Sequence, residues 1–353
     1  MGRVTEALEI AVRAYSVWEE EPWRFQPHEA LEAELARPRL VLVLDTETTT
    51  DPSQRLLFGS YRLCDVFWDA EGPKLSCVEE GLLYGDTLPE SDSNGFDVLV
   101  DYARTHAPAI DTWGATPSPI LQPRPRSVFL KEVFRPAVLQ ARAVLVCFNL
   151  PFDLSRLALH WSKVGPRRRQ TLEELDRRSA FEGGFSLCLD GRVDAAGKWH
   201  DNPAWPRALV KHIDSKRALK AFGPAAKGFV NPEDLVPDGD GRKRTFRGHL
   251  LDLRTIAFVL TDKGHTLESA CDAFDVPYKK RNVTHGVIRP EYVDYNREDV
   301  EATCELYVAT MREYIRHPID LQATKAYSPA TLGKAYLEAL GITPPVARLG
   351  RIR

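Results

Sequence analysis

The segment LDTETTTDP, residues 44–52, places two acidic side chains directly after an apolar run. Residues 40–44 alternate Leu and Val, which predicts a strand buried on both faces. Asp45 and Glu47 follow, and side chains two positions apart in an extended segment point to the same side. Two carboxylates packed together repel, and a divalent cation removes that cost. Because oxygen ligands favour Mg²⁺ or Mn²⁺ over zinc, the pair indicates a cation site at the end of a central strand.

The spacing of this acidic pair says little by itself. Asp and Glu make up 50 of the 353 residues, so pairs spaced Asp-x-Glu should occur about once or twice by chance. The sequence contains three such pairs: Asp45/Glu47, Asp69/Glu71 and Asp299/Glu301. What distinguishes the first pair is its position after the buried strand.

Two further acidic motifs follow along the chain. CFNLPFDLSRL, residues 147–157, places Asp153 near the start of a predicted helix, where a carboxylate is electrostatically favourable. YNREDVEAT, residues 295–303, places Tyr295 and Asp299 four positions apart on one face of a later predicted helix. Either motif alone is also typical of an ordinary helix, so only their combination with the strand acids indicates a shared site.

Apolar periodicity predicts the secondary structure in outline. Four strands are expected, at 40–45, 57–68, 74–84 and 143–149. Eight helices are expected, at 5–20, 95–106, 127–139, 152–161, 251–260, 266–274, 289–315 and 327–342. The Pro-rich stretch 115–126 should be irregular, and the stretch 185–200 should form a hairpin closed at Asp190-Gly191. This order of elements predicts a mixed sheet with helices packed on its faces.

The motifs DTETTT, NLPFD and YNRED, in that order, resemble those of the DEDD superfamily of 3′–5′ exonucleases. The tyrosine places the likeness in the tyrosine-bearing (DEDDy) branch, and the motifs are similar to those of the proofreading domain of family B DNA polymerases of the protein-primed type. The likeness covers residues 39–160 and 250–315. It implies an α/β, ribonuclease-H-like fold, with a mixed five-stranded sheet flanked by helices. Residues 163–250 interrupt the pattern of strands and helices, which indicates an inserted basic subdomain that contains β-strands.

The resemblance divides the chain into five parts. We expect an N-terminal helical extension, a first part of the exonuclease core, a basic insertion, a last part of the core and a C-terminal helical tail, at 1–38, 39–162, 163–250, 251–315 and 316–353.

The charge distribution supports the basic insertion. The chain carries a net charge of −3, yet residues 163–247 hold 18 Lys and Arg against 12 Asp and Glu. The runs 167–169 and 242–244 are candidate phosphate contacts, although a solvated surface is the more common use of such charges. Trp199 and Trp205 could stack on bases or pack in a core.

The resemblance also implies roles for individual residues. Two divalent metal ions, Mg²⁺ or Mn²⁺, are expected to be bound by four carboxylates: Asp45, Glu47, Asp153 and Asp299. Tyr295 is expected to hold the attacking water, and a phenol is better suited to orienting a water than to deprotonating it. Val283 stands three residues after Lys280, as in the family's lysine motif. By this likeness Lys280 is expected to approach the scissile phosphate.

Three further residues match positions that hold the substrate strand in the family: Thr48, Asn149 and Phe152. For Phe152 a place in the core is an equally good interpretation. Phe148 stands where the protein-primed group often has His, so any contact made by that His is not expected here.

The sequence therefore predicts a metal-dependent 3′–5′ exonuclease acting on single-stranded or frayed DNA 3′ ends, either free-standing or as part of a polymerase-like protein. Two alternatives remain open: a module that binds nucleic-acid ends with little catalysis, and an RNA-trimming exoribonuclease of the same branch. No apolar stretch is long enough for a membrane span, and the six cysteines are singly spaced. We expect a cytoplasmic, nucleoid-associated protein whose partners are nucleic-acid ends and polymerase, replication or repair proteins.

Overall fold

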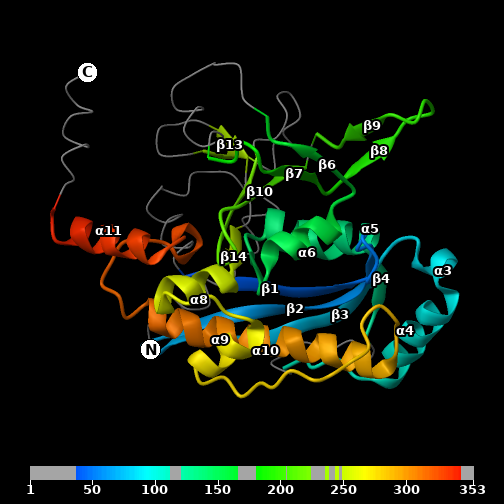
Figure 1. Ribbon diagram of the computed structural model, residues 1–353, viewed down its shortest axis with the longest axis horizontal. Helices are drawn as coiled ribbons and strands as arrows, with labels where there is room; N and C mark the ends of the chain where they lie inside the picture. Colours follow the sequence, from blue (N-terminus) through cyan, green and yellow to red (C-terminus); the bar gives the residue numbers. More distant parts are fainter. Residues whose placement is uncertain are drawn as a thin grey trace, which may run out of the picture.

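The computed structural model describes residues 37–111, 121–165, 180–203, 205–223, 235–237, 243–245 and 249–342 (Figure 1). At its centre is a six-stranded sheet in the order β14-β5-β1-β2-β3-β4. Its strands are β1 (Leu40–Thr48), β2 (Leu56–Asp69), β3 (Gly72–Tyr84), β4 (Pro123–Pro125), β5 (Val144–Cys147) and β14 (His249–Asp252). β1 runs antiparallel to β2 and parallel to β5, and β14 runs parallel to β5. The predicted mixed α/β architecture is confirmed.

The sheet has one strand more than the five expected, and two of its strands, β4 and β14, were not predicted. β14 takes up the first residues of the helix predicted at 251–260, which begins at Leu253 instead, because the chain there pairs with β5. β4 forms within the Pro-rich stretch that was expected to be irregular. β4 pairs in parallel with β3 at the edge of the sheet. Proline lacks an N–H donor, and an edge strand needs donors on one side only. Pro123 and Pro125 can therefore be accommodated there.

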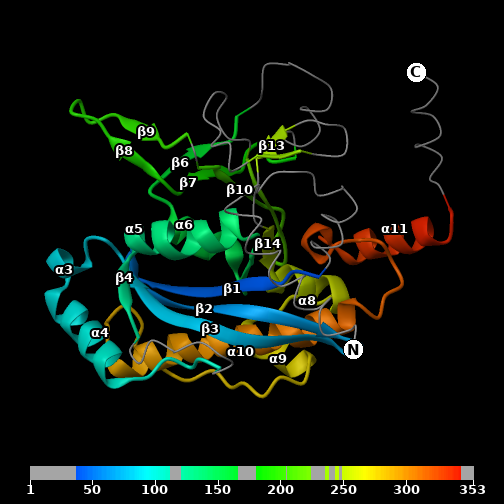
Figure 2. The ribbon, with the colours of Figure 1, turned by 180° about the vertical axis from the view of Figure 1, so that it is seen from behind.

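Helices cover both faces of the sheet (Figures 1 and 2). On one side lie α5 (Arg126–Phe129), the π-helix η1 (Leu130–Gln140) and α6 (Leu150–Leu157); on the other lie α8 (Leu253–Thr261), α9 (Leu267–Ala273) and α10 (Pro290–Tyr314). The short α3 (Leu88–Ser91) and α4 (Ser93–Thr105) follow β3. None of the helices among the described residues has the length and apolar character that crossing a membrane requires.

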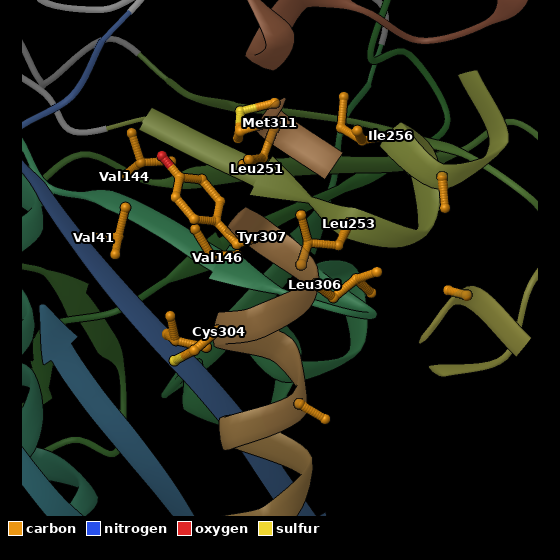
Figure 3. Close-up of a cluster of buried hydrophobic side chains, with 14 of the residues drawn as sticks. Val41, Val144, Val146, Leu251, Leu253, Ile256, Cys304, Leu306, Tyr307 and Met311 are labelled. Atoms are coloured by element: carbon orange, nitrogen blue, oxygen red, sulfur yellow. The ribbon is translucent and has the colours of Figure 1, made fainter. Parts of the chain in front are cut away.

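The continuous apolar run of β1 is explained by burial on both faces. Leu42 and Leu44 belong to a cluster with residues of η1 and α6. Val41 and Val43 belong to a second cluster with residues of α8 and α10, in which Tyr307 is a large buried side chain (Figure 3). The strand that carries the acidic pair is thus held rigidly between two cores.

Strands that follow α6 form a second, four-stranded sheet in the order β11-β10-β7-β6, which contacts α6 through β10. Its strands are β6 (His160–Lys163), β7 (Phe185–Cys188), β10 (Ala208–His212) and β11 (Ala218–Phe222). Two small pairs accompany it: β8 (Gly191–Val193) with β9 (Trp199–Asp201), and β12 (Leu235–Pro237) with β13 (Lys243–Thr245).

Two predictions in this region are wrong. The helix expected at 152–161 ends at Leu157, because the chain becomes extended and pairs with β7 as β6. The hairpin expected to close at Asp190-Gly191 closes instead between β8 and β9, where the Asp194 carboxylate accepts hydrogen bonds from the Ala196 and Lys198 amides. In the first case tertiary pairing outweighed the local helical signal; in the second, hydrogen bonds to Asp194 within the loop fix the turn.

Helices were predicted near both ends of the chain. The predicted helix at 5–20 and the extension at 1–38 lie, apart from residues 37 and 38, outside the described residues. The tail contains the short helix η3 (Ala323–Lys325) and α11 (Pro329–Ala339), at the position of the predicted final helix. All six cysteines are buried and unpaired.

Gly59 of β2 provides a test of how closely the strands pack beside the acidic pair. A Cβ at this position would lie 2.5 Å from the backbone oxygen of Asp45, which cannot move without displacing β1. Gly59→Ala is therefore expected to lower the free energy of unfolding by about 2–3 kcal/mol in urea denaturation. Gly333→Ala in α11 is the matched control, because a Cβ there meets nothing within 4 Å. Equal stability of the two variants would contradict this packing.

Candidate active site

Four acidic side chains from three elements meet towards the C-terminal end of β1. Asp45 and Glu47 lie on β1, Asp153 lies in the first turn of α6, and Asp299 lies in the middle of α10. Asp153 and Asp299 are only 1% and 7% exposed. The charge of Asp45 interacts with those of the other three carboxylates. The structure thus brings together the acids of all three sequence motifs.

Asp45 and Glu47 both face α10. The Asn296 amide donates to Asp45 Oδ2 at 2.6 Å, and the Tyr292 hydroxyl donates to Glu47 Oε2 at 2.6 Å. Asn296 is fully buried and also accepts a hydrogen bond from Ser60 Oγ of β2 at 2.7 Å. The strand acids are therefore oriented by a network that joins β1, β2 and α10.

Asp153 is hydrogen-bonded to Thr46, the residue of β1 that lies between Asp45 and Glu47. The backbone amide and the hydroxyl of Thr46 donate to Asp153 Oδ1, at 3.1 and 2.7 Å. The other carboxylate oxygen, Oδ2, is buried and has no hydrogen-bond partner among the described residues. α6 begins at Leu150 with Pro151 in its first turn, a favourable position for proline, and this start places Asp153 beside β1.

Asp299 lies near two phenols. It accepts a hydrogen bond from the Tyr278 hydroxyl, which belongs to the loop between α9 and α10. Tyr295 lies one turn earlier on α10, where burial and then the nearby Asp299 charge raise the pKa of its phenol. The predicted convergence of Tyr295 and Asp299 on one helix face is therefore present.

One face of α10 carries most of the site. Tyr292, Tyr295, Asn296 and Asp299 occupy positions i, i+3, i+4 and i+7 of one helix face, and all are buried. Sequence reasoning singled out Tyr295 and Asp299 but missed Tyr292 and Asn296, although the helical period would have placed them on the same face. It also missed Tyr278, for which a loop offers no periodic signal.

The hydroxyls of the three tyrosines remain protonated near neutral pH. Burial and the neighbouring carboxylates raise the pKa of Tyr278, Tyr292 and Tyr295 far above the usual value of 10. Each phenol can therefore donate a hydrogen bond in this site but is not suited to act as a base.

The loop between α9 and α10 brings cationic and imidazole groups to the acids. Lys280 Nζ lies 5.6 Å from the centre of the Tyr295 ring. His285 Nδ1 lies 3.9 Å from Glu47 Oε2 and 3.3 Å from the Tyr292 hydroxyl. The next residue, Gly286, has φ +84°, and a Cβ there would meet Thr50 at 2.9 Å, so glycine permits the close approach of loop and strand. His285 had no signal in the sequence.

The four carboxylates destabilise one another's charged forms. Burial raises the pKa of Glu47 and of Asp153 to about 7 in each case. Burial first, and then repulsion from the other acids, raises the pKa of Asp45 well above its ordinary value; burial also raises that of Asp299. The positive charge of Lys280 offsets only part of this effect. The set therefore favours a bound cation.

The donor set fits a cation that takes oxygen ligands, since it consists of carboxylates and includes the unpartnered Asp153 Oδ2. Within the described part of the chain, however, no group of three or more His, Cys, Asp or Glu side chains is arranged as a ready-made metal site. The carboxylates are instead engaged by protein donors, which include Tyr278, Tyr292 and Asn296.

The three residues expected to hold the substrate strand lie close in the chain to Glu47 or Asp153. Thr48 is the last residue of β1, after an irregularity in its pairing with β2. Asn149 precedes α6 and its side chain makes no capping hydrogen bond. Phe152, in the first turn of α6, is half-buried beneath the Arg156 guanidinium, which lies 4.9 Å from its ring. Among the described contacts, none ties these three side chains to the carboxylates.

The structure describes both tryptophans that were considered for base stacking, but little of the two basic runs. Residues 167–169 and 242 lie outside the described residues, and only the backbone of 243–244 is described, in β13. Trp205 is 6% exposed and packs in the core, beneath Arg135. Trp199 stacks on His160 with ring centres 5.3 Å apart.

No protein-family model, curated protein or solved structure matches this chain.

Proposed function

We propose that the protein is a metal-dependent 3′–5′ exonuclease that removes nucleotides from single-stranded or frayed DNA 3′ ends. The observation that carries the proposal is the convergence of four carboxylates from β1, α6 and α10, of which Asp153 and Asp299 are buried. A fold gains nothing from four repelling acids in one place, whereas a phosphodiesterase needs them. The mixed sheet flanked by helices is compatible with the ribonuclease-H-like, DEDDy architecture that belongs to the same proposal.

In this proposal Asp45, Glu47, Asp153 and Asp299 hold two Mg²⁺ or Mn²⁺ ions. When bound, such a pair activates a water and stabilises the leaving 3′ oxygen of an in-line displacement. The donors that now engage the carboxylates keep the side chains in place for this task.

The surrounding residues orient the reactants. The Tyr295 phenol, which stays protonated, holds the attacking water by a hydrogen bond and does not remove its proton. Lys280 supplies a positive charge on the open side of the site, where the scissile phosphate arrives. Thr48, Asn149 and Phe152 line the approach of the terminal nucleotides.

A digestion assay tests the proposal. A 5′-labelled single-stranded DNA should be shortened stepwise in Mg²⁺ or Mn²⁺, and not at all in EDTA. The same strand with a blocked 3′ end should persist, because the proposed site attacks the terminal phosphodiester. Binding without trimming in either ion would favour an end-binding module instead.

An RNA of the same sequence belongs in the same assay. Faster trimming of RNA than of DNA would assign the site to the exoribonucleases of this branch, since contacts to the 2′-hydroxyl decide that preference. Association with the nucleoid and with polymerase, replication or repair proteins is part of the DNA proposal.

A further inference from the structure

The edge strand of the inserted sheet exposes large aromatic side chains. All four residues of β6 are exposed, and Trp161 is 60% exposed. Phe185, on the neighbouring β7, is 42% exposed. The two rings meet edge to face, with centres 5.6 Å apart and planes at 73°. Adjacent exposed apolar side chains are one of the features by which interaction sites are recognised.

Strand register places a lysine on the same surface. Lys163 is paired directly with Phe185, and Trp161 lies two positions before Lys163, so the three side chains share one face of the sheet. We call Trp161, Lys163 and Phe185 the β6 surface. Trp161 is the last residue of the helix predicted at 152–161, so the sequence alone does not indicate this arrangement.

The charge of the β6 surface is uncompensated within the described part of the chain. There, Lys163 makes no ion pair, whereas acids of the same subdomain are engaged: Asp201 with Arg207, and Asp214 with Arg217. A cation on the same face as two exposed aromatic rings matches the chemistry of a single nucleic-acid strand, which offers phosphates and the faces of unpaired bases.

The β6 surface is also close to the proposed catalytic site. Only seven residues separate Trp161 from Asp153, four of them in α6. At about 1.5 Å per helical residue and about 3.4 Å per extended residue, the two positions are at most about 20 Å apart. A strand of about six stacked nucleotides spans that distance.

We propose that the β6 surface stacks with unpaired bases of the strand whose 3′ end is held at the four carboxylates. This inference rests on the proposed function and extends it to a substrate class: single strands several nucleotides long, in preference to dinucleotides. The binding is insensitive to base sequence, because every base offers a face for stacking.

Binding is measured by fluorescence anisotropy with labelled oligothymidylate of 12 nucleotides, in the Asp45→Ala/Glu47→Ala background so that the probe stays intact. Trp161→Ala should raise Kd about tenfold, the usual effect of losing one aromatic stacking partner. Trp161→Phe should raise it less than threefold, since a ring remains. Phe67→Ala is the matched control, because Phe67 is also 60% exposed but lies on β2 near the hairpin to β3.

A second variant tests the charge of the β6 surface without removing an aromatic ring, so it is less prone to misfolding. Lys163→Ala leaves both rings in place and should reduce the slope of log K against log salt by about one unit. Thermal melting of each variant checks that the fold is retained.

The outcomes separate the two proposals. If Trp161→Ala and Phe67→Ala bind the 12-mer as tightly as the parent does, the β6 surface proposal is wrong, whatever the trimming activity. A Trp161→Ala variant that binds normally but changes its oligomeric state would also overturn it and would make the surface an interface between copies. If Trp161→Ala binds tenfold more weakly but the wild-type chain does not trim DNA, the β6 surface proposal is supported and the exonuclease proposal is wrong.

Discussion

Replacing Asp45 and Glu47 together with Ala is expected to reduce metal-dependent trimming of single-stranded DNA by about 10³-fold or more, equivalent to about 4 kcal/mol of transition-state stabilisation. The two side chains supply half of the carboxylates that converge at the site and are the pair that faces α10. Rates are compared in Mg²⁺ and Mn²⁺ at saturating ion, because weaker metal binding alone is then overcome.

The chain contains a matched control for this variant. Asp69 and Glu71 have the same spacing but lie at the tip of the β2–β3 hairpin, where Asp69 accepts hydrogen bonds from the Glu71 and Gly72 amides. Asp69→Asn/Glu71→Gln removes two acids of the same type and should trim at the wild-type rate. Trimming that survives in the Asp45/Glu47 variant, or is lost equally in the control, would refute the assignment.

Glu47→Gln is expected to stabilise the protein in the absence of metal. Burial raises the pKa of Glu47 from 4.5 to about 7, so the folded chain binds a proton more tightly than the unfolded chain does. Stability is therefore lost as the pH rises from about 4.5 through about 7. Gln has the same shape, carries no charge and still accepts the hydrogen bond from Tyr292. At pH 7.5 in EDTA the free energy of unfolding should rise by about 2–3 kcal/mol.

Thermal melting at two pH values measures this effect. The melting temperature of Glu47→Gln should exceed that of wild type by several degrees at pH 7.5 and match it near pH 4.5. Excess Mn²⁺ should restore the wild-type protein, because a ligand that binds only the folded state stabilises it. Glu71→Gln, at the exposed hairpin tip, serves as the control and should melt like wild type. A Glu47→Gln variant that is less stable at pH 7.5 would mean that the carboxylate is structural.

The strand and helix acids could be predicted from the sequence because each belongs to a periodic element. A buried strand fixes the direction of Asp45 and Glu47, and helical spacing fixes that of Tyr295 and Asp299. The donors that hold these acids were harder to find. Tyr292 and Asn296 follow the same helical period, but Tyr278 and His285 come from a loop, where only tertiary structure determines which side chain reaches the site.

The same distinction applies to the fold. The long strands of the central sheet and α10 were predicted within a few residues, because their own side chains bury a continuous face. β4, β6 and β14 were missed, because each is a short edge strand formed by pairing with a neighbour. The β6 error had a consequence for function, since it hid the exposure of Trp161.

Diffraction at the manganese absorption edge, from crystals grown with Mn²⁺, tests the central claim most directly. We predict two anomalous peaks about 3.5–4 Å apart, enclosed by the carboxylates of Asp45, Glu47, Asp153 and Asp299. No peak at this position, or peaks bound only by other residues, would contradict the account.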